Sequence, residues 1–249
     1  MSDQLIAIVD HKQMISDLLV GIVNYIKVFS DCQSLIADCS SLIANSLSTP
    51  FLLLALRLIN ANTMLLDLQP TLEDDLVHMR PLVADDFESL YAVALDPLIW
   101  EQHPNKTRYQ RPVFESFFSE ALKSKGALII IDRVKNIVIG SSRYYEYNLE
   151  KRSVIIGYTF LSRDYWGSVY NRAVKTLMLN HAFKSVDEVV FEIGAGNIRS
   201  QKAIEKIGAI KTGTIEKDFP GEENKINFIY RITKKEWESI FSLTKETKP

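Results

Sequence analysis

The chain has 249 residues, and its 47% of hydrophobic and 24% of charged residues exclude a disordered, fibrous or disulfide-dense protein. Its net charge of −2, from 29 basic and 31 acidic side chains, excludes a general attraction to nucleic acid or to an anionic membrane. No stretch reaches the roughly 18–20 uninterrupted apolar residues of a membrane-spanning helix, because the nearest candidate ends at Arg57. We therefore expect a globular, cytoplasmic protein that has one large domain, or one domain with an appendage.

Residues 1–63 differ in composition from the rest of the chain. Three apolar, serine-rich segments lie there, at residues 5–29, 34–47 and 50–59. Apolar side chains from Ile15 to Ile26 recur near helical spacing, which predicts an amphipathic helix. We predict a helical extension of unknown role, and a helix that covers an exposed sheet face is one interpretation of it.

Two further observations bear on this extension. Met64 is followed by a polar, acidic lead-in, so a chain that starts functionally at Met64 is the other interpretation. Cys32 and Cys39 lie seven residues apart and match no metal motif, so we expect two free thiols. The 4 histidines are dispersed along the chain, and we expect no metal site.

From residue 64 onward, strand-like and helix-like segments alternate, which is the order of a layered α+β domain. The predicted strands cover residues 76–80, 126–133, 137–147, 153–161, 188–193, 210–217 and 225–232. The predicted helices cover residues 84–95, 113–123, 168–183, 198–207 and 234–243. Short polar connections join the strands between residues 126 and 161, so these three strands are expected to form an antiparallel meander.

The candidate functional residues lie in two segments. In each of them a strand leads through a turn into a helix. The first runs from Gly157 to Ala173 and turns at Trp166-Gly167. Such a turn leaves unpaired N–H groups at the start of a helix, where the helix dipole favours a pyrophosphate. The second places Asn197 and Ser200 three residues apart on one helical face, although Asn197 is also a good N-cap residue.

Taken together, these motifs resemble a known family. A strand that ends in Gly-Tyr-x-Phe-Leu, a Trp-Gly turn into a helix, and then Asn-x-x-Ser-x-x-x-Ile-Glu-Lys-x-Gly-Ala are similar to the GNAT acetyltransferases. The most similar subgroup is the RimJ/RimL-like N-terminal acetyltransferases of ribosomal proteins. The resemblance covers residues 76–237 and opens with Arg80-Pro-Leu82. The expected acetyltransferase domain comprises residues 64–249, and residues 76–237 are its core.

The resemblance implies the GNAT acyl-CoA N-acyltransferase fold, a mixed and mostly antiparallel sheet flanked by helices. Two central parallel strands, which end near Phe160 and Ile193, would splay apart and admit acetyl-CoA. The implied activity is direct transfer of an acetyl group to a primary amine, on a protein N-terminus or a small molecule, without a metal. Both monomers and homodimers are compatible with this architecture.

The resemblance also implies roles for individual residues. Asn197 would bind the pantetheine arm, and the Ser200 hydroxyl would protonate the departing thiolate. A backbone N–H of Phe160, Leu161 or Ser162 would hold the acetyl carbonyl. Amides of the turn would hold the pyrophosphate, and the residues of this turn are Tyr165, Trp166, Gly167, Ser168, Val169, Tyr170 and Asn171. Apart from the resemblance, Arg172 and Arg199 lie near the two helix starts, where phosphate contacts are one interpretation and solvated surface arginines are the other.

The chain departs from the family pattern at the pyrophosphate turn and at the catalytic base. Asp164 and Val169 replace a cation and a small residue in the turn, and Val169 is expected to crowd the phosphate. Ile155 stands where the subgroup often has a glutamate base. Glu146 is the first candidate for the base and Glu192 the second.

These departures motivate an alternative of a different class, a degenerate domain that binds CoA or a partner without turnover. His103 lies in the loop where this superfamily has its substrate-gating segment, so a role in lining the acceptor site is one interpretation of it, and a histidine without a functional role is the other.

Overall fold

The computed structural model describes residues 65–216 and 226–246 of the chain. The chain divides into two units after Thr63, and all of the described residues belong to the second unit. The predictions for residues 1–63, including the amphipathic helix and the two cysteines, lie outside the described residues. So does the predicted start of the last strand at residue 225.

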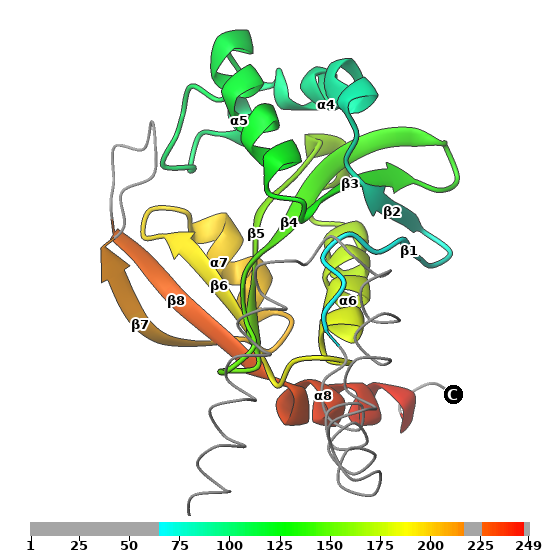
Figure 1. Ribbon diagram of the computed structural model, residues 1–249, viewed down its shortest axis with the longest axis vertical. Helices are drawn as coiled ribbons and strands as arrows, with labels where there is room; N and C mark the ends of the chain where they lie inside the picture. The colour runs from blue at the N-terminus through cyan, green and yellow to red at the C-terminus, as the bar shows by residue number, and fades with distance from the viewer. Residues whose placement is uncertain (1–64, 217–225, 247–249) are drawn as a thin grey trace, which may run out of the picture. The chain divides into compact units, whose positions relative to one another are not determined.

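A mixed eight-stranded sheet forms the framework, with the strand order β1-β2-β3-β4-β5-β6-β8-β7 (Figure 1). The strands are β1 (Leu72–Glu73), β2 (Val77–Pro81), β3 (Ala127–Asp132), β4 (Ile137–Asn148), β5 (Ser153–Leu161), β6 (Glu188–Gly194), β7 (Ile210–Glu216) and β8 (Ile226–Thr233). All neighbours pair antiparallel except β5 and β6, which are parallel. The predicted fold class is confirmed, because the sheet is mostly antiparallel with a parallel pair at its centre.

Helices flank this sheet. They are α4 (Phe87–Ala94), α5 (Arg111–Lys123), α6 (Tyr170–Ala182), α7 (Ile198–Glu205) and α8 (Lys234–Glu246). Short 3-10 turns lie at η1 (Ala84–Asp86), η2 (Pro97–Ile99) and η3 (Arg163–Tyr165). The helix predicted over residues 84–95 is therefore divided between η1 and α4. The long helix predicted from residue 168 begins two residues later, because Gly167 adopts a left-handed conformation with a φ of 69°.

Side chains of β3 pack against helices on both faces of the sheet. The alternate side chains Leu128 and Ile130 belong to one buried cluster together with apolar residues of α6. Ile129 belongs to a second buried cluster, formed with residues of α4 and α5. Because side chains of a strand alternate between faces, α6 covers one face of β3–β5, and α4 and α5 cover the other (Figure 1).

None of the helices within residues 65–216 and 226–246 has the length and apolar character needed to cross a bilayer. The same residues contain no group of three or more His, Cys, Asp or Glu side chains arranged to hold a metal ion.

Candidate active site

The two parallel strands separate soon after they start. Strands β5 and β6 pair only from Ser153, opposite Glu188, to Ile155, opposite Val190. Beyond this point β5 continues to Leu161, and no described strand pairs with it on that side. The opening coincides with a bulge in β5, because its register against β4 shifts after Gly157 and Tyr158 has a positive φ of 52°.

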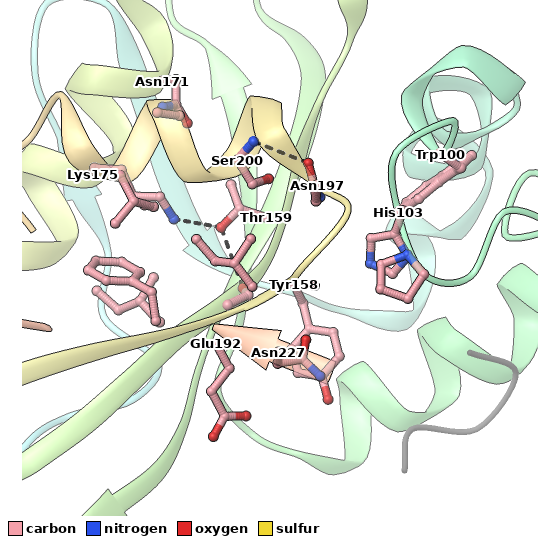
Figure 2. Close-up of a pocket in the computed structure, with 18 of the residues that line it drawn as sticks. Trp100, His103, Tyr158, Thr159, Asn171, Lys175, Glu192, Asn197, Ser200 and Asn227 are labelled. Atoms are coloured by element: carbon pink, nitrogen blue, oxygen red, sulfur yellow. Dashed lines mark hydrogen bonds between the residues drawn. The ribbon is translucent and has the colours of Figure 1, made fainter. Parts of the chain in front are cut away.

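A cavity of about 140 Å³ lies where the strands diverge (Figure 2). Its walls come from β5, β6, the first two turns of α6 and α7, the loop that joins α4 to α5, and one residue each of β4 and β8. The polar side chains that line it are His103, Arg108, Tyr145, Tyr158, Thr159, Asn171, Lys175, Glu192, Asn197, Ser200 and Asn227. The cavity therefore combines an open strand edge with the starts of two helices.

The turn before α6 presents a row of exposed backbone N–H groups. In the described part of the chain, no hydrogen bond is donated by the amides of Gly167, Ser168, Val169, Asn171 and Arg172. Intrahelical bonding begins only with Ala173, whose N–H donates to the Val169 carbonyl at 2.9 Å. Together with the positive end of the α6 dipole, these amides form an anion-binding site.

Asp132, at the end of β3, holds this turn in place. Its carboxylate accepts hydrogen bonds from the hydroxyls of Tyr165, at 2.7 Å, and Tyr170, at 3.2 Å. Burial of Asp132 raises its pKa, but the Tyr165 hydroxyl and nearby backbone N–H groups outweigh burial and keep the pKa below its usual range. Burial and the bond to Asp132 raise the pKa of Tyr165. Both tyrosines therefore build the turn with their side chains.

At the start of α7, Asn197 is both an N-cap and part of the cavity wall. Its Oδ1 accepts a hydrogen bond from the Ser200 N–H at 3.1 Å, and its side chain lines the cavity (Figure 2). Because Oδ1 is used by the cap, the amide nitrogen is the end of Asn197 that remains for a ligand. The Ser200 hydroxyl, which also lines the cavity, makes no hydrogen bond to any described residue.

Lys175 lies one helical turn beyond Asn171 and points into the same cavity (Figure 2). The residue is only 3% exposed, and its Nζ donates to Thr159 Oγ1 at 2.6 Å. Burial lowers the pKa of Lys175 from its usual 10.5 to about 7. The cavity thus contains an amine whose charge changes near neutral pH.

Comparison with protein families decides the identity. The family model described as "Acetyltransferase (GNAT) domain" matches residues 77–210, which is more than half of the chain. The chain belongs to the GNAT acetyltransferase family. No curated protein matches the chain.

Solved structures share this GNAT fold at low sequence identity. A GCN5-related N-acetyltransferase from Brucella melitensis is 17% identical with a TM-score of 0.63, and the match covers 72% of this chain and 85% of that one. RimJ from Mycobacterium smegmatis, in complex with CoA-disulfide, is 16% identical with a TM-score of 0.54, covering 71% and 94%. Spermidine N-acetyltransferase from Vibrio cholerae, in complex with CoA and spermine, is 14% identical with a TM-score of 0.52, covering 66% and 99%.

In this GNAT domain, the residues predicted for the acetyl carbonyl, 160–162, are not among those that line the cavity. Phe160 is buried against Trp100 and Phe117, in the cluster beneath α4 and α5. The Ser162 N–H already donates to the Ile139 carbonyl at 2.8 Å, and the Leu161 carbonyl accepts from the Trp166 indole. The part of β5 that borders the cavity is instead the bulged stretch from residue 156 to 159.

The remaining predicted phosphate ligands divide into two groups. Val169 points outward with 60% of its side chain exposed, and Arg172 is exposed beside it. Arg199, in contrast, stacks its guanidinium 3.8 Å from the centre of the Trp166 ring and donates to the Ile99 carbonyl. Arg199 and Trp166 therefore join α7 to the α6 turn and to η2, and neither lines the cavity.

The two candidates for the base occupy different places. Glu192 of β6 lines the cavity, whereas Glu146 of β4 is exposed and is not one of the lining residues. His103 lines the cavity as the position of its loop suggested, and burial followed by the nearby Arg108 lowers its pKa well below 6.5. His103 is therefore neutral over the physiological range.

Lys175 is one of the polar cavity residues that sequence reasoning did not identify; the others are Arg108, Thr159 and Asn227. A lysine in an amphipathic helix usually lies on the solvent face, so its type gave no sign of burial. Its spacing of four residues from Asn171 was the available signal, because residues i and i+4 share a helical face.

Proposed function

We propose that this GNAT domain is an N-acetyltransferase that moves the acetyl group of acetyl-CoA directly to a primary amine. The observation that carries the proposal is the cavity at the split between β5 and β6, with the open amides of α6 at its edge. A thioester and an amine held together in such a cavity react faster, because binding has already removed the translational and rotational freedom that the reaction would otherwise lose.

The residues around the cavity fit acetyl-CoA. The open amides from Gly167 to Arg172 match the charge and the multiple acceptor oxygens of a pyrophosphate, and Arg172 adds an exposed cation. Val169 does not close this site, because its side chain points to solvent. The Asn197 amide nitrogen can donate to a carbonyl of the pantetheine arm. The two CoA-bound neighbours share this fold, which supports acetyl-CoA as the cosubstrate.

Each end of the cavity has its own chemistry. The starts of α6 and α7 define the CoA end, where the Ser200 hydroxyl meets the departing sulfur. The other end is lined by the α4–α5 loop, with His103 and Arg108, and by Glu192 of β6. We assign this second end to the acceptor, and Glu192 to the removal of the proton that an amine must lose before or during attack.

The acceptor is proposed as a class only, an amine on a protein N-terminus or on a small molecule. Spermidine N-acetyltransferase and a "putative ribosomal-protein-serine acetyltransferase", both from Vibrio cholerae, occur among the structural neighbours, and their names represent the small-molecule and the protein choice respectively. A cavity of about 140 Å³ is too small for a folded segment, so a protein acceptor must enter through an extended terminus.

A thiol-release assay tests the proposal. Acetyl-CoA is offered with separate pools of polyamines, amino acids and peptides that have free N-termini, and the released CoA thiol is measured. We expect turnover with one pool, and Ser200→Ala to lower kcat by about 10²-fold, the lower range for loss of a proton-transferring group. Ser116→Ala, an exposed serine of α5, is the matched control and leaves kcat unchanged.

Two results would count against the proposal in different ways. Equal kcat values for Ser200→Ala, Asn197→Ala and the unaltered chain would remove the site assignment. Binding of acetyl-CoA without thiol release from any pool would favour the alternative, a domain that binds CoA without turnover.

A further inference from the structure

Lys175 is a buried amine to which the proposed chemistry assigns no role. Its Nζ has one hydrogen-bond partner among the described residues, the Thr159 hydroxyl, which in turn lies 2.7 Å from the Ser142 hydroxyl. No carboxylate pairs with Lys175 in that part of the chain. A buried lysine without a counter-ion is costly, so its presence next to a cavity points to a use within that cavity.

The position of Lys175 points to the CoA end. Asn171 and Lys175 follow one another on the same face of α6, so the line from the open amides through Asn171 leads inward to Lys175. Ser200 projects into this cavity from α7 (Figure 2). The other titratable groups of the lining come from different elements: His103 and Arg108 from the loop, Tyr145 from β4, Tyr158 from β5 and Glu192 from β6.

The acid strengths of an alcohol and a thiol show that Ser200 requires a second proton donor. An alcohol hydroxyl is nearly as weak an acid as water, whereas a thiol is a much stronger acid, with a pKa of about 8.5. A serine hydroxyl therefore cannot give a thiolate its proton unless another group replaces that proton. The ammonium of Lys175, with its pKa lowered by burial to about 7, is a stronger acid than a thiol, so proton transfer to the sulfur is downhill.

We propose that Lys175 faces the sulfur of CoA and that its ammonium form supplies the proton which the departing thiolate takes up, directly or through the Ser200 hydroxyl. The carbon–sulfur bond of the thioester breaks as the carbon–nitrogen bond to the acceptor forms, and the electron pair left on sulfur binds the lysine proton. Lys175 becomes neutral and regains a proton released by the acceptor amine. This inference rests on the proposed function.

The test uses a matched pair of ligands, CoA and desulfo-CoA, which lacks the thiol. Lysine side chains are labelled with carbon-13 in the full chain, and the Lys175 signal is assigned from the spectrum of Lys175→Met. We expect CoA to raise the pKa of Lys175 toward that of a free lysine, because an adjacent thiolate favours the ammonium. Desulfo-CoA is expected to leave this pKa unchanged or to lower it.

Binding constants give a second readout. Near the pKa of the thiol, about 8.5, the unaltered chain should bind CoA roughly tenfold more tightly than desulfo-CoA, the scale of one charge-assisted hydrogen bond. Lys175→Met should bring this ratio close to one. Lys184→Met, which replaces an exposed lysine after α6, should keep the ratio of the unaltered chain.

The outcomes separate this inference from the proposed function. If both ligands bind and shift the Lys175 signal equally, or if Lys175→Met keeps the tenfold ratio, the inference is overturned while the acetyltransferase proposal stands. If neither ligand binds the unaltered chain, the proposed function fails and the inference fails with it.

Discussion

Asn197 uses the two ends of its amide group for different purposes. The oxygen caps α7 by accepting the Ser200 N–H, and the nitrogen remains for a ligand in the cavity. The sequence left two interpretations of this residue open, an N-cap or a CoA ligand, and the cap is now observed. The two roles are compatible because the group has an acceptor and a donor at separate atoms.

Two variants separate these roles. Asn197→Ala removes both ends, so we expect a loss of about 1 kcal/mol in the free energy of unfolding and weaker CoA binding. Asn197→Asp keeps an oxygen for the cap but has no N–H to donate, so it should keep the stability and lose only affinity. Denaturant unfolding and calorimetric titration with CoA measure both quantities, and normal affinity in Asn197→Asp would exclude the ligand role.

Lys175 makes stability depend on pH. Burial lowers the pKa of Lys175 from 10.5 to about 7, so between these values the unfolded chain binds a proton that the folded chain lacks. Stability therefore rises with pH across this window, and below about pH 7 the buried charge costs on the order of 5 kcal/mol. Lys175→Met should be more stable than the unaltered chain at pH 7, and the difference should shrink toward pH 10.

Chemical denaturation at several pH values measures this difference, with Lys184→Met as the control. A difference that stays constant from pH 7 to pH 10, or a Lys175→Met variant that is less stable throughout, would contradict a depressed pKa.

At the scale of elements, the turn into α6 depends on one glycine. Gly167 has a positive φ of 69°, while a Cβ at this position would meet open space, so the backbone conformation and not a lack of room requires glycine. Gly196, in the turn before α7, also faces open space but has no positive φ. The two glycines form a matched pair.

Alanine at each position tests the turn. Gly167→Ala should cost about 1 kcal/mol of stability or more, because alanine is strained at positive φ, and it should weaken CoA binding by misaligning the open amides. Gly196→Ala should leave stability unchanged or slightly raised. CoA affinity that is unchanged in Gly167→Ala would show that the α6 turn holds no phosphate.

Most elements of the domain could be predicted, because local pattern determines them. The apolar run of β3 and the helical spacing of α6 needed no tertiary information. The bulge in β5 did, because its register against β4 depends on the partner strand and not on residue type. The acetyl-carbonyl site was therefore expected at Phe160 to Ser162, whereas the structure brings residues 156–159 to the cavity.

The burial of Lys175 could not be predicted from the sequence for a related reason. Its helix has the ordinary pattern of an amphipathic segment, and only the separation of β5 from β6 opens a polar cavity below that face of α6. The overall resemblance gave the splayed strands, but it could not say which helical side chains would point between them.

On the scale of the whole molecule, the described domain contains every group that the proposed chemistry uses. Residues 65–216 and 226–246 supply the sheet, both helix starts and the cavity. We therefore propose that a chain beginning at Met64 folds and retains CoA binding. Thermal unfolding and calorimetry on that chain test the proposal, and failure to fold would assign residues 1–63 a structural role.

The central claim is that the split between β5 and β6, together with the open amides of α6, binds the CoA thioester. A crystal structure of the chain with CoA tests it most directly. The account predicts a pyrophosphate hydrogen-bonded to amides between Gly167 and Arg172, with the pantetheine arm running between the two strands toward Ser200 and Lys175. A pyrophosphate bound elsewhere, or a cavity that stays closed to the arm, would contradict the account.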